Sequence, residues 1–429
     1  MRRLFPALLV LALLIVPLGL AACGDDDGSS GGGDVSDASF DMTVGALLPL
    51  TGGLSAFGPA GQKAAELAIQ ESQKALEGTD IKLADLESED SQTLPQPAQS
   101  AAEKLISDGA NCLVGPWSSS ETIPVGRSVA ARQQIPLVSP SATSPEITDL
   151  PDDGYVYRTA PSDAIQGQVL ADRVEEDLGS ADGTVSVAAR NDAYGEGIAT
   201  TFADAWEEKG GTTTGPVLYD LELSSYNSEA DEIVADNPDA FVIIDFEEPY
   251  NAVGAALART GDFDASKMWT ADGLAFEDGI PDSISPDSLY NAQGTRPSTR
   301  DDTDTAKSFD DLFTSSPGEK KRNSFDSQNF DAVTLCVLGA VAAGSNEGSD
   351  ISEKIGEVAG PPGDKYDYTQ MADAVEAIQN GDDIDFEGVS GTLDMDENGD
   401  PTEGFYEVYS YDDKGNFSVE DNVEQEAGE

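Results

Sequence analysis

The sequence contains no histidine among its 429 residues. This absence excludes Ser–His–Asp and Cys–His catalytic groups and the usual zinc sites, and it leaves no side chain whose ordinary pKa lies near neutrality. Basic residues are also scarce: 23 lysines and arginines stand against 82 aspartates and glutamates, and the formal net charge is −59. Because such a negative field repels nucleic acids and anionic lipids, we expect no nucleic-acid partner.

The N-terminus has the features of a secretory signal that ends in a lipobox. Arg2 and Arg3 precede an apolar run over 4–20, and Leu20-Ala21-Ala22-Cys23 places small residues before a cysteine. The run contains two prolines and is marginal in length for a bilayer of about 30 Å, so we prefer a signal peptide to an uncleaved membrane helix. The spacing resembles that of bacterial lipoprotein signals, in which the cysteine receives a diacylglyceryl group.

We therefore expect residues 1–22 to be a signal peptide and Cys23 to be the lipidated first residue of the mature protein. Residues 23–40 are rich in Gly, Ser and Asp and predict a flexible linker. The resulting location is extracytoplasmic, with the protein anchored to the cell membrane by the lipid on Cys23.

The remaining cysteines, Cys112 and Cys336, each lie in an apolar run. The sequence leaves two states open, separate buried thiols or a disulfide, and we favour the separate thiols.

From residue 41 onward, short apolar runs alternate with longer amphipathic ones, a rhythm that predicts βαβ units and parallel sheets covered on both faces. The first module has expected strands at 42–50, 81–86, 111–114 and 135–139 and helices at 61–75, 95–107 and 118–133. The second has strands at 184–189, 214–219 and 241–245 and helices at 164–177, 196–209, 229–235 and 250–260. A further helix at 327–343 and short strands near 404–411 complete the α/β pattern.

In open parallel sheets, ligands bind beyond the carboxyl ends of the strands, where helix N-termini present free N–H groups. Ser118 and Glu121 have capping-box spacing after one strand, and Thr143 and Glu146 repeat it after the next. Two hydroxyl-bearing helix starts on neighbouring strands form a natural site for a carboxylate. The alternative is that both hydroxyls only cap their helices.

The second module carries acids and aromatic residues at the equivalent ends. Tyr194 stands at the start of a helix, Asp245-Phe246-Glu247 follows one strand and Asp272 follows another. Hydroxyl groups on one module and carboxylates on the other predict a cleft between the modules that binds a zwitterion. Spacing alone slightly favours the alternative, that these are ordinary turn acids in a very acidic protein.

A set of motifs, in order along the chain, resembles the leucine/isoleucine/valine-binding protein family of type I periplasmic binding proteins. The similarity runs from about residue 42 to the C-terminus and is strongest up to Gly273. It rests on Leu48-Pro49-Leu50-Thr51-Gly52, Phe57-Gly58, Gly115-Pro116-Trp117-Ser118-Ser119, Ser139-Pro140-Ser141-Ala142-Thr143-Ser144-Pro145-Glu146, Tyr157-Arg158-Thr159 and Asp192-Ala193-Tyr194-Gly195-Glu196-Gly197.

The resemblance implies two Rossmann-like lobes with parallel sheets, joined by a three-crossing hinge and closing on an amino acid. The expected lobes are 41–161 plus 296–406 and 162–295 plus 407–429. The resemblance further implies the following ligand contacts: the carboxylate at Ser118, Ser141, Ala142 and Thr143, the ammonium at Tyr194 and Asp272, and the side chain against Phe57 and Trp117.

Two positions depart from the family pattern. Phe57 stands where branched-chain binders have tyrosine, and Phe246-Glu247 replaces an uncharged aromatic segment. Both changes put branched-chain specificity in doubt, and Glu247 or Asp245 would favour a ligand with an additional positive group.

The resulting hypothesis is a monomeric, non-catalytic substrate-binding lipoprotein that delivers an amino-acid-like solute to the permease of an ABC importer. The alternatives are a sensor for a signalling partner, a binder of amides, urea or polyamines, and an enzyme acting on glycans or amides. No cofactor is expected, because Gly195-Glu196-Gly197 lacks the third glycine of a dinucleotide motif. No metal is expected either: 394–400 opens like a calcium loop, but Phe405 occupies its twelfth position, so a surface hairpin turn is preferred.

Overall fold

The computed structural model describes residues 35, 38–300, 303–319 and 321–426, and Asp34–Glu429 is one compact unit. The expected signal peptide (1–22) and Cys23 lie outside the described residues. Within the described part of the chain, no helix is long and apolar enough to cross a membrane.

The first lobe is built on a five-stranded parallel sheet, in the order β4-β2-β5-β6-β7. A short parallel pair, β1 with β3, lies beside it. The strands are β1 (Asp41–Met42), β2 (Val44–Leu48), β3 (Lys82–Leu83), β4 (Glu87–Asp90), β5 (Cys112–Val114), β6 (Leu137–Ser139) and β7 (Val156–Arg158).

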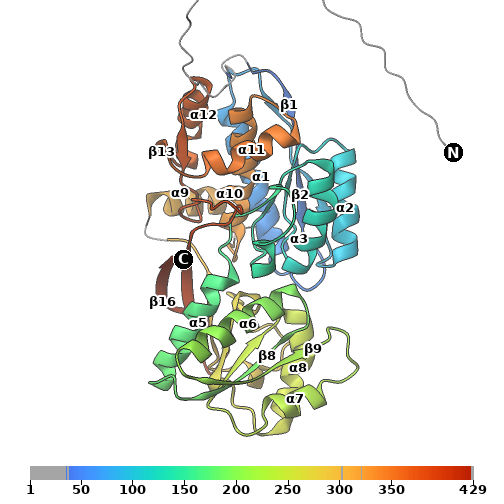
Figure 1. Cartoon of the computed structure of the whole chain (residues 1–429), viewed down its shortest axis with the longest axis vertical. Helices are drawn as coiled ribbons and strands as arrows, with labels where there is room; N and C mark the ends of the chain where they lie inside the picture. The colour runs from blue at the N-terminus through green and yellow to red at the C-terminus, as the bar shows by residue number, and fades with distance from the viewer. Residues whose placement is uncertain (1–34, 36–37, 301–302, 320, 427–429) are drawn as a thin grey trace, which may run out of the picture. The chain divides into compact units, whose positions relative to one another are not determined.

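Helices cover both faces of this sheet, as the alternating apolar runs predict. Leu113 packs into a core with α2 and α3, whereas its neighbours Cys112 and Val114 pack into another with α1 and α10. Figure 1 shows β2 between α1 and the pair α2 and α3. The helices of this lobe are α1 (Gly58–Ala75), α2 (Pro95–Ser107), α3 (Ser119–Val125), α4 (Ala131–Gln133), α9 (Asp304–Ser315), α10 (Asp326–Ala343), α11 (Gly348–Val358) and α12 (Met371–Gln379).

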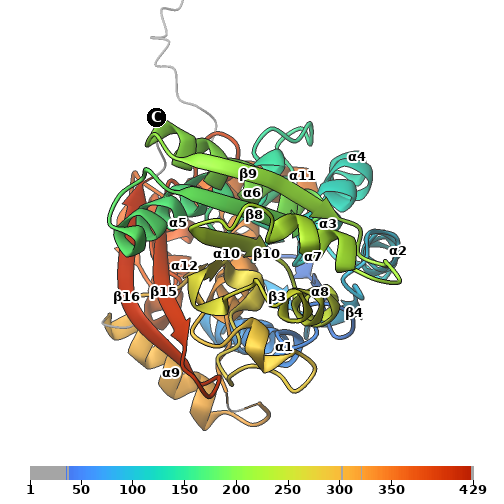
Figure 2. The ribbon, with the colours of Figure 1, turned by 90° about the horizontal axis from the view of Figure 1, so that it is seen from below.

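The second lobe is built on a seven-stranded mixed sheet, in the order β16-β15-β12-β11-β10-β8-β9. Strands β8 to β12 pair in parallel, and β15 and β16 are added antiparallel at one edge (Figure 2). The strands are β8 (Thr184–Arg190), β9 (Thr212–Tyr219), β10 (Ala240–Ile244), β11 (Met268–Thr270), β12 (Gln293–Pro297), β15 (Glu403–Tyr411) and β16 (Phe417–Glu426).

This sheet is also covered on both faces. Val187 and Val242 pack with α5 (Asp163–Leu178) and α6 (Ala193–Glu208) on one face. Ala188 and Phe241 pack on the other with α7 (Asn227–Ile233) and α8 (Glu247–Thr260). The expected α/β class with two doubly covered sheets is therefore confirmed.

Several elements differ from the sequence-based expectation. Strand β4 was not expected, because Glu-Ser-Glu-Asp has no apolar alternation and forms a strand only through pairing with β2. Helices α9, α11 and α12 were also missed. The expected lobe boundaries at 295/296 and 406/407 fall inside β12 and β15, which both belong to the seven-stranded sheet.

The expectation of separate thiols is wrong, because Cys112 and Cys336 form a disulfide. It joins β5 to α10 across the core of the first lobe, between positions 224 residues apart in sequence. The apolar runs that contain Cys112 and Cys336 do not indicate that the two cysteines are in contact. Only the packing of α10 on the sheet brings them together.

The expected surface turn at 394–400 is present: Met395 pairs with Pro401, and Asp396 Oδ1 accepts from the backbone N–H groups of Asn398 and Asp400. Asp400 also forms a buried ion pair with Arg158 of β7.

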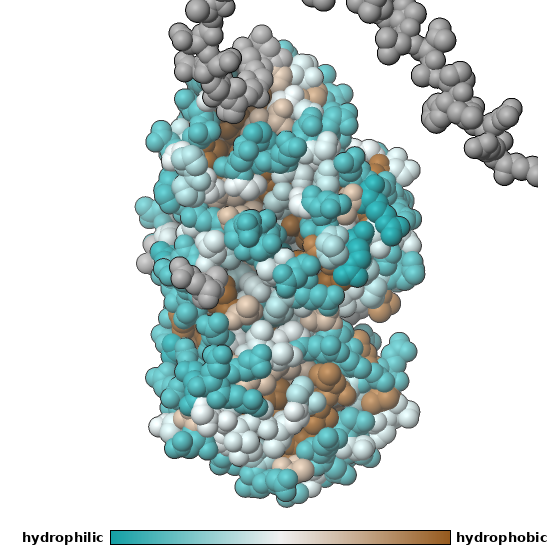
Figure 3. Space-filling view, viewed as in Figure 1, coloured by the Kyte–Doolittle hydropathy of each residue, from teal (hydrophilic) through white to brown (hydrophobic). Residues whose placement is uncertain are grey.

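The face of the molecule drawn in Figure 3 is mainly hydrophilic, in keeping with the acidic composition.

Candidate functional site

A small cavity lies where the carboxyl ends of the strands of both lobes meet. The first lobe contributes residues after β2, β5 and β6, and the second contributes residues after β8, β10 and β11. Its volume is about 10 Å³, roughly the space for a single water molecule. It is lined by Leu54, Phe57, Trp117, Ser118, Ser119, Ser141, Tyr194, Phe246, Asp272, Gly273 and Phe325.

Seven of the residues expected from the sequence are in this lining: Phe57, Trp117, Ser118, Ser141, Tyr194, Phe246 and Asp272. Hydroxyl groups of the first lobe and the carboxylate and phenol of the second therefore face the same cavity. Ala142 and Thr143 are fully buried directly beside Ser141.

Ser118 is positioned by the expected capping box at the start of α3. Its N–H and its hydroxyl both donate to Glu121 Oε2, at 3.2 and 2.8 Å. Burial raises the pKa of Glu121 to about 7. The Ser141 hydroxyl donates to the carbonyl of Trp117 at 2.7 Å, so the loops after β5 and β6 are tied together.

The second expected capping box is wrong by one residue. Ser144, not Thr143, caps the short helix Pro145–Ile147, and its hydroxyl accepts from the N–H of Glu146 at 3.3 Å. The buried Thr143 hydroxyl lies beside the carboxylate of Asp163. Burial raises the pKa of Asp163 well above its usual range, and the hydrogen bond from Thr143 opposes this effect.

The acidic side of the cavity is held by a network around Asp272, which lies in the short helix Asp272–Leu274 after β11. Asp272 Oδ1 accepts from the hydroxyl of Tyr194 and from the amide of Gln166, both at 3.2 Å. The Tyr194 hydroxyl in turn accepts from the N–H of Gly273 at 3.2 Å. Burial raises the pKa of Asp272 to about 6.

The Phe246 ring is fixed between two other side chains. It stacks on Tyr194 with ring centroids 4.9 Å apart, and the Arg190 guanidinium lies 3.8 Å from its centroid. Arg190 is held by Asp192 at 2.7 Å and lies 3.8 Å from Asp245. This stack keeps the aromatic wall of the second lobe rigid.

The opposite wall contains Trp117 and Phe325, whose rings meet edge to face at 6.4 Å. Gly61 of α1 lets Trp117 pack against the helix, because a Cβ at this position would collide with the indole ring. Phe325 has φ +66°, an unusual conformation for a phenylalanine, at the residue before α10. Sequence reasoning missed Phe325, Leu54, Ser119 and Gly273, and we find no motif that would have identified Phe325.

Glu247 and Asp245 are directed elsewhere. The Glu247 carboxylate accepts from the hydroxyl of Ser283 at 2.6 Å. Asp245 accepts from the hydroxyl of Tyr219 at 2.8 Å and lies beside Arg190. Neither lines the cavity, so the ligand contact expected for Glu247 stays a prediction that this geometry does not favour.

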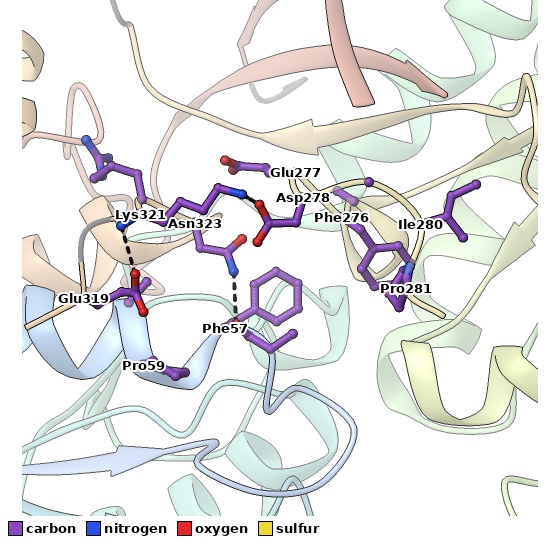
Figure 4. A pocket seen from close by; sticks show the side chains of 15 residues that line it. Phe57, Pro59, Phe276, Glu277, Asp278, Ile280, Pro281, Glu319, Lys321 and Asn323 are labelled. Atoms are coloured by element: carbon purple, nitrogen blue, oxygen red, sulfur yellow. Dashed lines mark hydrogen bonds and ion pairs between the residues drawn. The ribbon is translucent and has the colours of Figure 1, made fainter. Parts of the chain in front are cut away.

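A larger cavity of about 370 Å³ adjoins the small one and shares Phe57 with it. Figure 4 shows Phe57 and Pro59 of the first lobe opposite Phe276, Ile280 and Pro281 of the second. Lys321 forms an ion pair with Asp278 across this space, and the Asn323 side chain donates to the carbonyl of Ala56 at 3.1 Å. Phe57 is the residue that the linings of the two cavities have in common.

The described residues contain no group of three or more Asp, Glu or Cys side chains placed to hold a metal ion. The polar groups of the cavity instead suit a small organic molecule with donor and acceptor groups.

A family model described as periplasmic binding protein matches residues 41–414. The chain belongs to this family. Its α/β fold and motifs are those of the type I members of the leucine/isoleucine/valine-binding branch, which are solute-binding proteins rather than enzymes.

Two relatives illustrate the range of this family. A Leu/Ile/Val-binding protein homolog of Brucella melitensis is 27% identical, covering 89% of this chain and 94% of the relative. The chemotactic signal transduction system substrate-binding protein BasB of Halobacterium salinarum is 26% identical, covering 85% and 86%.

Solved structures share the fold at lower identity. The branched-chain amino acid substrate-binding protein LivJ of Streptococcus pneumoniae, in complex with isoleucine, superposes with a TM-score of 0.70 at 20% identity, covering 90% of this chain and 99% of that one. A solute-binding protein of R. palustris in complex with 4-hydroxybenzoate superposes with a TM-score of 0.69 at 16% identity, covering 90% and 97%.

Proposed function

We propose that this periplasmic binding protein captures an amino acid or a close analogue by closure of its two lobes and delivers it to the permease of an ABC importer. The observation that carries the proposal is the composition of the small cavity. Hydroxyl groups come from one lobe, and a carboxylate and a phenol come from the other.

The chemistry of a zwitterion fits this arrangement. The hydroxyl-bearing residues Ser118, Ser141 and Thr143 of the first lobe supply a site for the ligand carboxylate. Asp272 and Tyr194 supply acceptors for an ammonium group, and the aromatic rings enclose the side chain. A ligand that reaches both lobes favours the closed state, because only differential contacts shift the population.

The cavity of about 10 Å³ is too small for any amino acid, so the ligand must enter a more open arrangement. The proposed route of entry leads past Phe57, which lines both this cavity and the one of about 370 Å³. The ligand-bound state is therefore expected to differ from this one by a rotation of one lobe relative to the other.

A thermal-shift screen against the standard amino acids, amides, urea and polyamines tests the ligand class, and calorimetry then tests each positive compound. We expect at least one amino acid to raise the melting temperature and to bind one per chain. Stabilisation by amides, urea or polyamines alone would contradict the amino-acid assignment while leaving solute binding intact.

Aromatic carboxylic acids are the second candidate class, because Phe57, Trp117, Tyr194, Phe246 and Phe325 line the cavity and the R. palustris structure contains 4-hydroxybenzoate. The screen should therefore include benzoate and 4-hydroxybenzoate. Their binding in preference to all amino acids would favour this second class.

Delivery to a signalling partner is the alternative to transport, and the name of the Halobacterium relative motivates it. Genes for permeases and ATPases beside this one would support transport, whereas a neighbouring chemoreceptor gene would support sensing.

We further propose that a lipid on Cys23 anchors the protein to the outer face of the membrane. Cys23→Ser should release the protein into the soluble fraction after cell fractionation, with ligand binding unchanged. Membrane retention of this variant would contradict the anchor.

A further inference from the structure

The hydroxyl group of Ser118 is already committed to a neighbour within its own lobe. A serine hydroxyl has one hydrogen, and Ser118 donates it to Glu121 Oε2 at 2.8 Å. The Ser118 N–H donates to the same oxygen at 3.2 Å. Ser118 lines the small cavity. In this state its side chain therefore offers the cavity an acceptor, whereas a ligand carboxylate needs a donor.

Glu121 is a carboxyl group buried without a cation. Its side chain has no exposed surface, and among the described residues no lysine or arginine forms an ion pair with it. Besides Ser118, the groups that bond to its carboxyl are the hydroxyl of Ser91 and the N–H of Leu94, in the loop between β4 and α2. Because only neutral donors compensate the charge, burial favours the protonated form.

The charged groups around α3 do not offset this burial. Helix α3 packs against α2, residues 126–130, the short helix Pro145–Ile147 and α6. Every charged side chain on these elements is exposed: Glu103 and Lys104 of α2, Arg127, Glu146 and the four acids of α6. Asp90, at the end of β4, accepts from the hydroxyl of Thr51 at 2.7 Å. From the second lobe, Tyr194 and Asp272 face the same cavity as Ser118.

The protonation of Glu121 is therefore balanced near neutral pH. Burial is the largest effect on its carboxyl and raises the pKa to about 7, although the hydrogen bonds from Ser118 and Ser91 oppose it. Both forms of the group are populated within one pH unit of neutrality. A change in its protonation reverses the direction of the hydrogen bond to Ser118, since a neutral carboxyl group has an O–H to donate.

We infer that Glu121 takes up one proton from solvent when a ligand carboxylate binds, and that its O–H then donates to Ser118 Oγ and frees the Ser118 hydrogen for the ligand. In the ionised form, Glu121 instead holds that hydrogen and places a second buried negative charge near the ligand carboxylate. Glu121 is thus a positioning residue that acts through Ser118. The inference rests on the proposed function and adds control by pH to it. It applies to amino acids and to aromatic acids, because both carry a carboxylate.

Ligand-free unfolding tests the buried carboxyl itself. A carboxyl group whose pKa is raised by folding contributes stability that is complete below its unfolded pKa of about 4.3 and is lost as pH rises through its folded pKa, about 7. Glu121→Gln fits the capping box, and its amide reproduces the hydrogen bonds of the neutral acid. The melting temperature of Glu121→Gln relative to the wild type should therefore increase from pH 5 to pH 8. A constant difference would overturn the inference.

Calorimetry then tests the role of Glu121 in binding. The probes are L-leucine and 4-hydroxybenzoate, and the acid with the largest thermal shift replaces them if another one binds better. Titrations at pH 6 and pH 8, each in two buffers of different ionisation enthalpy, give the affinity and the number of protons exchanged. Asp331→Asn is the control, because it removes a carboxyl on α10 whose pKa burial raises to about 6.

We expect Glu121→Gln to match the wild type at pH 6 and to bind about tenfold more tightly at pH 8, where only about one wild-type molecule in ten has a neutral Glu121. At pH 8 the wild type should take up about one proton more per ligand than this variant. The Asp331→Asn variant should give the wild-type result in both measurements.

The outcomes separate the two claims. If Glu121→Gln keeps the wild-type pH dependence and proton count, the inference is overturned and the proposed function stands. Equal weakening of this variant at both pH values would show that Glu121 only caps α3, which also overturns the inference. Failure of every carboxylate ligand to bind overturns the proposed function and the inference together.

Discussion

The two walls of the cavity are built by different physical means. The first lobe presents hydroxyls at the ends of β5 and β6, fixed by short hydrogen bonds to neighbouring backbone and to Glu121. The second lobe presents a buried carboxylate, a phenol and a stacked phenylalanine, fixed by Gln166 and Arg190. The hydroxyl groups of Ser118 and Ser141 on the first wall donate to groups of their own lobe, as the phenol of Tyr194 on the second wall donates to Asp272.

The cores behind these walls differ as well. The first lobe carries the Cys112–Cys336 disulfide, which ties α10 to the sheet. The second lobe has no such crosslink among the described residues and depends on packing on both faces of its sheet. The lobe behind the first wall is therefore cross-linked by a disulfide, whereas the described residues of the lobe behind the second wall are held by non-covalent contacts only.

Removing the carboxylate of the second wall should have the largest effect. Asp272→Ala is expected to weaken an amino-acid ligand by about 2–5 kcal/mol, because a buried charge pair is broken. Calorimetry measures the change. Asp331→Ala, at a buried acid on α10, serves as the control and should leave affinity unchanged. Equal affinities for Asp272→Ala and the wild type would remove Asp272 from the site.

Opening the disulfide tests the difference between the two cores. The double variant Cys112→Ala/Cys336→Ala should lose about 2–4 kcal/mol of unfolding free energy. Amide exchange should become faster in β5 and α10 and change little in β8 and β10. Equal loss of protection in both sheets would show that the disulfide supports the whole molecule rather than one lobe.

Thr143→Val tests the hydroxyl wall of the first lobe. The hydroxyl lies beside the buried Asp163 carboxylate, so its replacement by a methyl group should leave the melting temperature unchanged or slightly lower. Calorimetry should show that binding weakens by about 1.5–3 kcal/mol if the hydroxyl donates to a ligand carboxylate. Thr270→Val, at a buried hydroxyl without a hydrogen-bond partner, should keep full affinity.

Gly61→Ala tests the packing behind Trp117 and should have the smallest effect. The added methyl group collides with the indole ring, and we expect a loss of about 1–3 kcal/mol in unfolding free energy. Gly356→Ala, in α11 with no atom near its added Cβ, should instead gain about 0.4–1 kcal/mol. Urea unfolding of both variants measures the contrast, and similar changes in the two would contradict the close contact at Gly61.

Sequence reasoning predicted the α/β class, the alternation of elements and most of the cavity lining. It succeeded where the signal is local: the capping box at Ser118 and the start of α2 at Pro95 depend on neighbouring residues only. It failed at β4, whose four polar residues become a strand only by pairing with β2. Phe325 also escaped it, because the chain reaches the cavity there from a segment more than two hundred residues away from Trp117.

Composition and short-range periodicity are enough to predict the two-module α/β alternation, the acidic charge and the hydroxyl and carboxyl groups that follow the strands. The folded chain was needed to show that Cys112 meets Cys336, that Ser144 replaces Thr143 as a cap, and that Asp163 is fully buried at the start of α5. Each of these depends on which groups long-range packing brings together or deprives of water, and no local pattern encodes that.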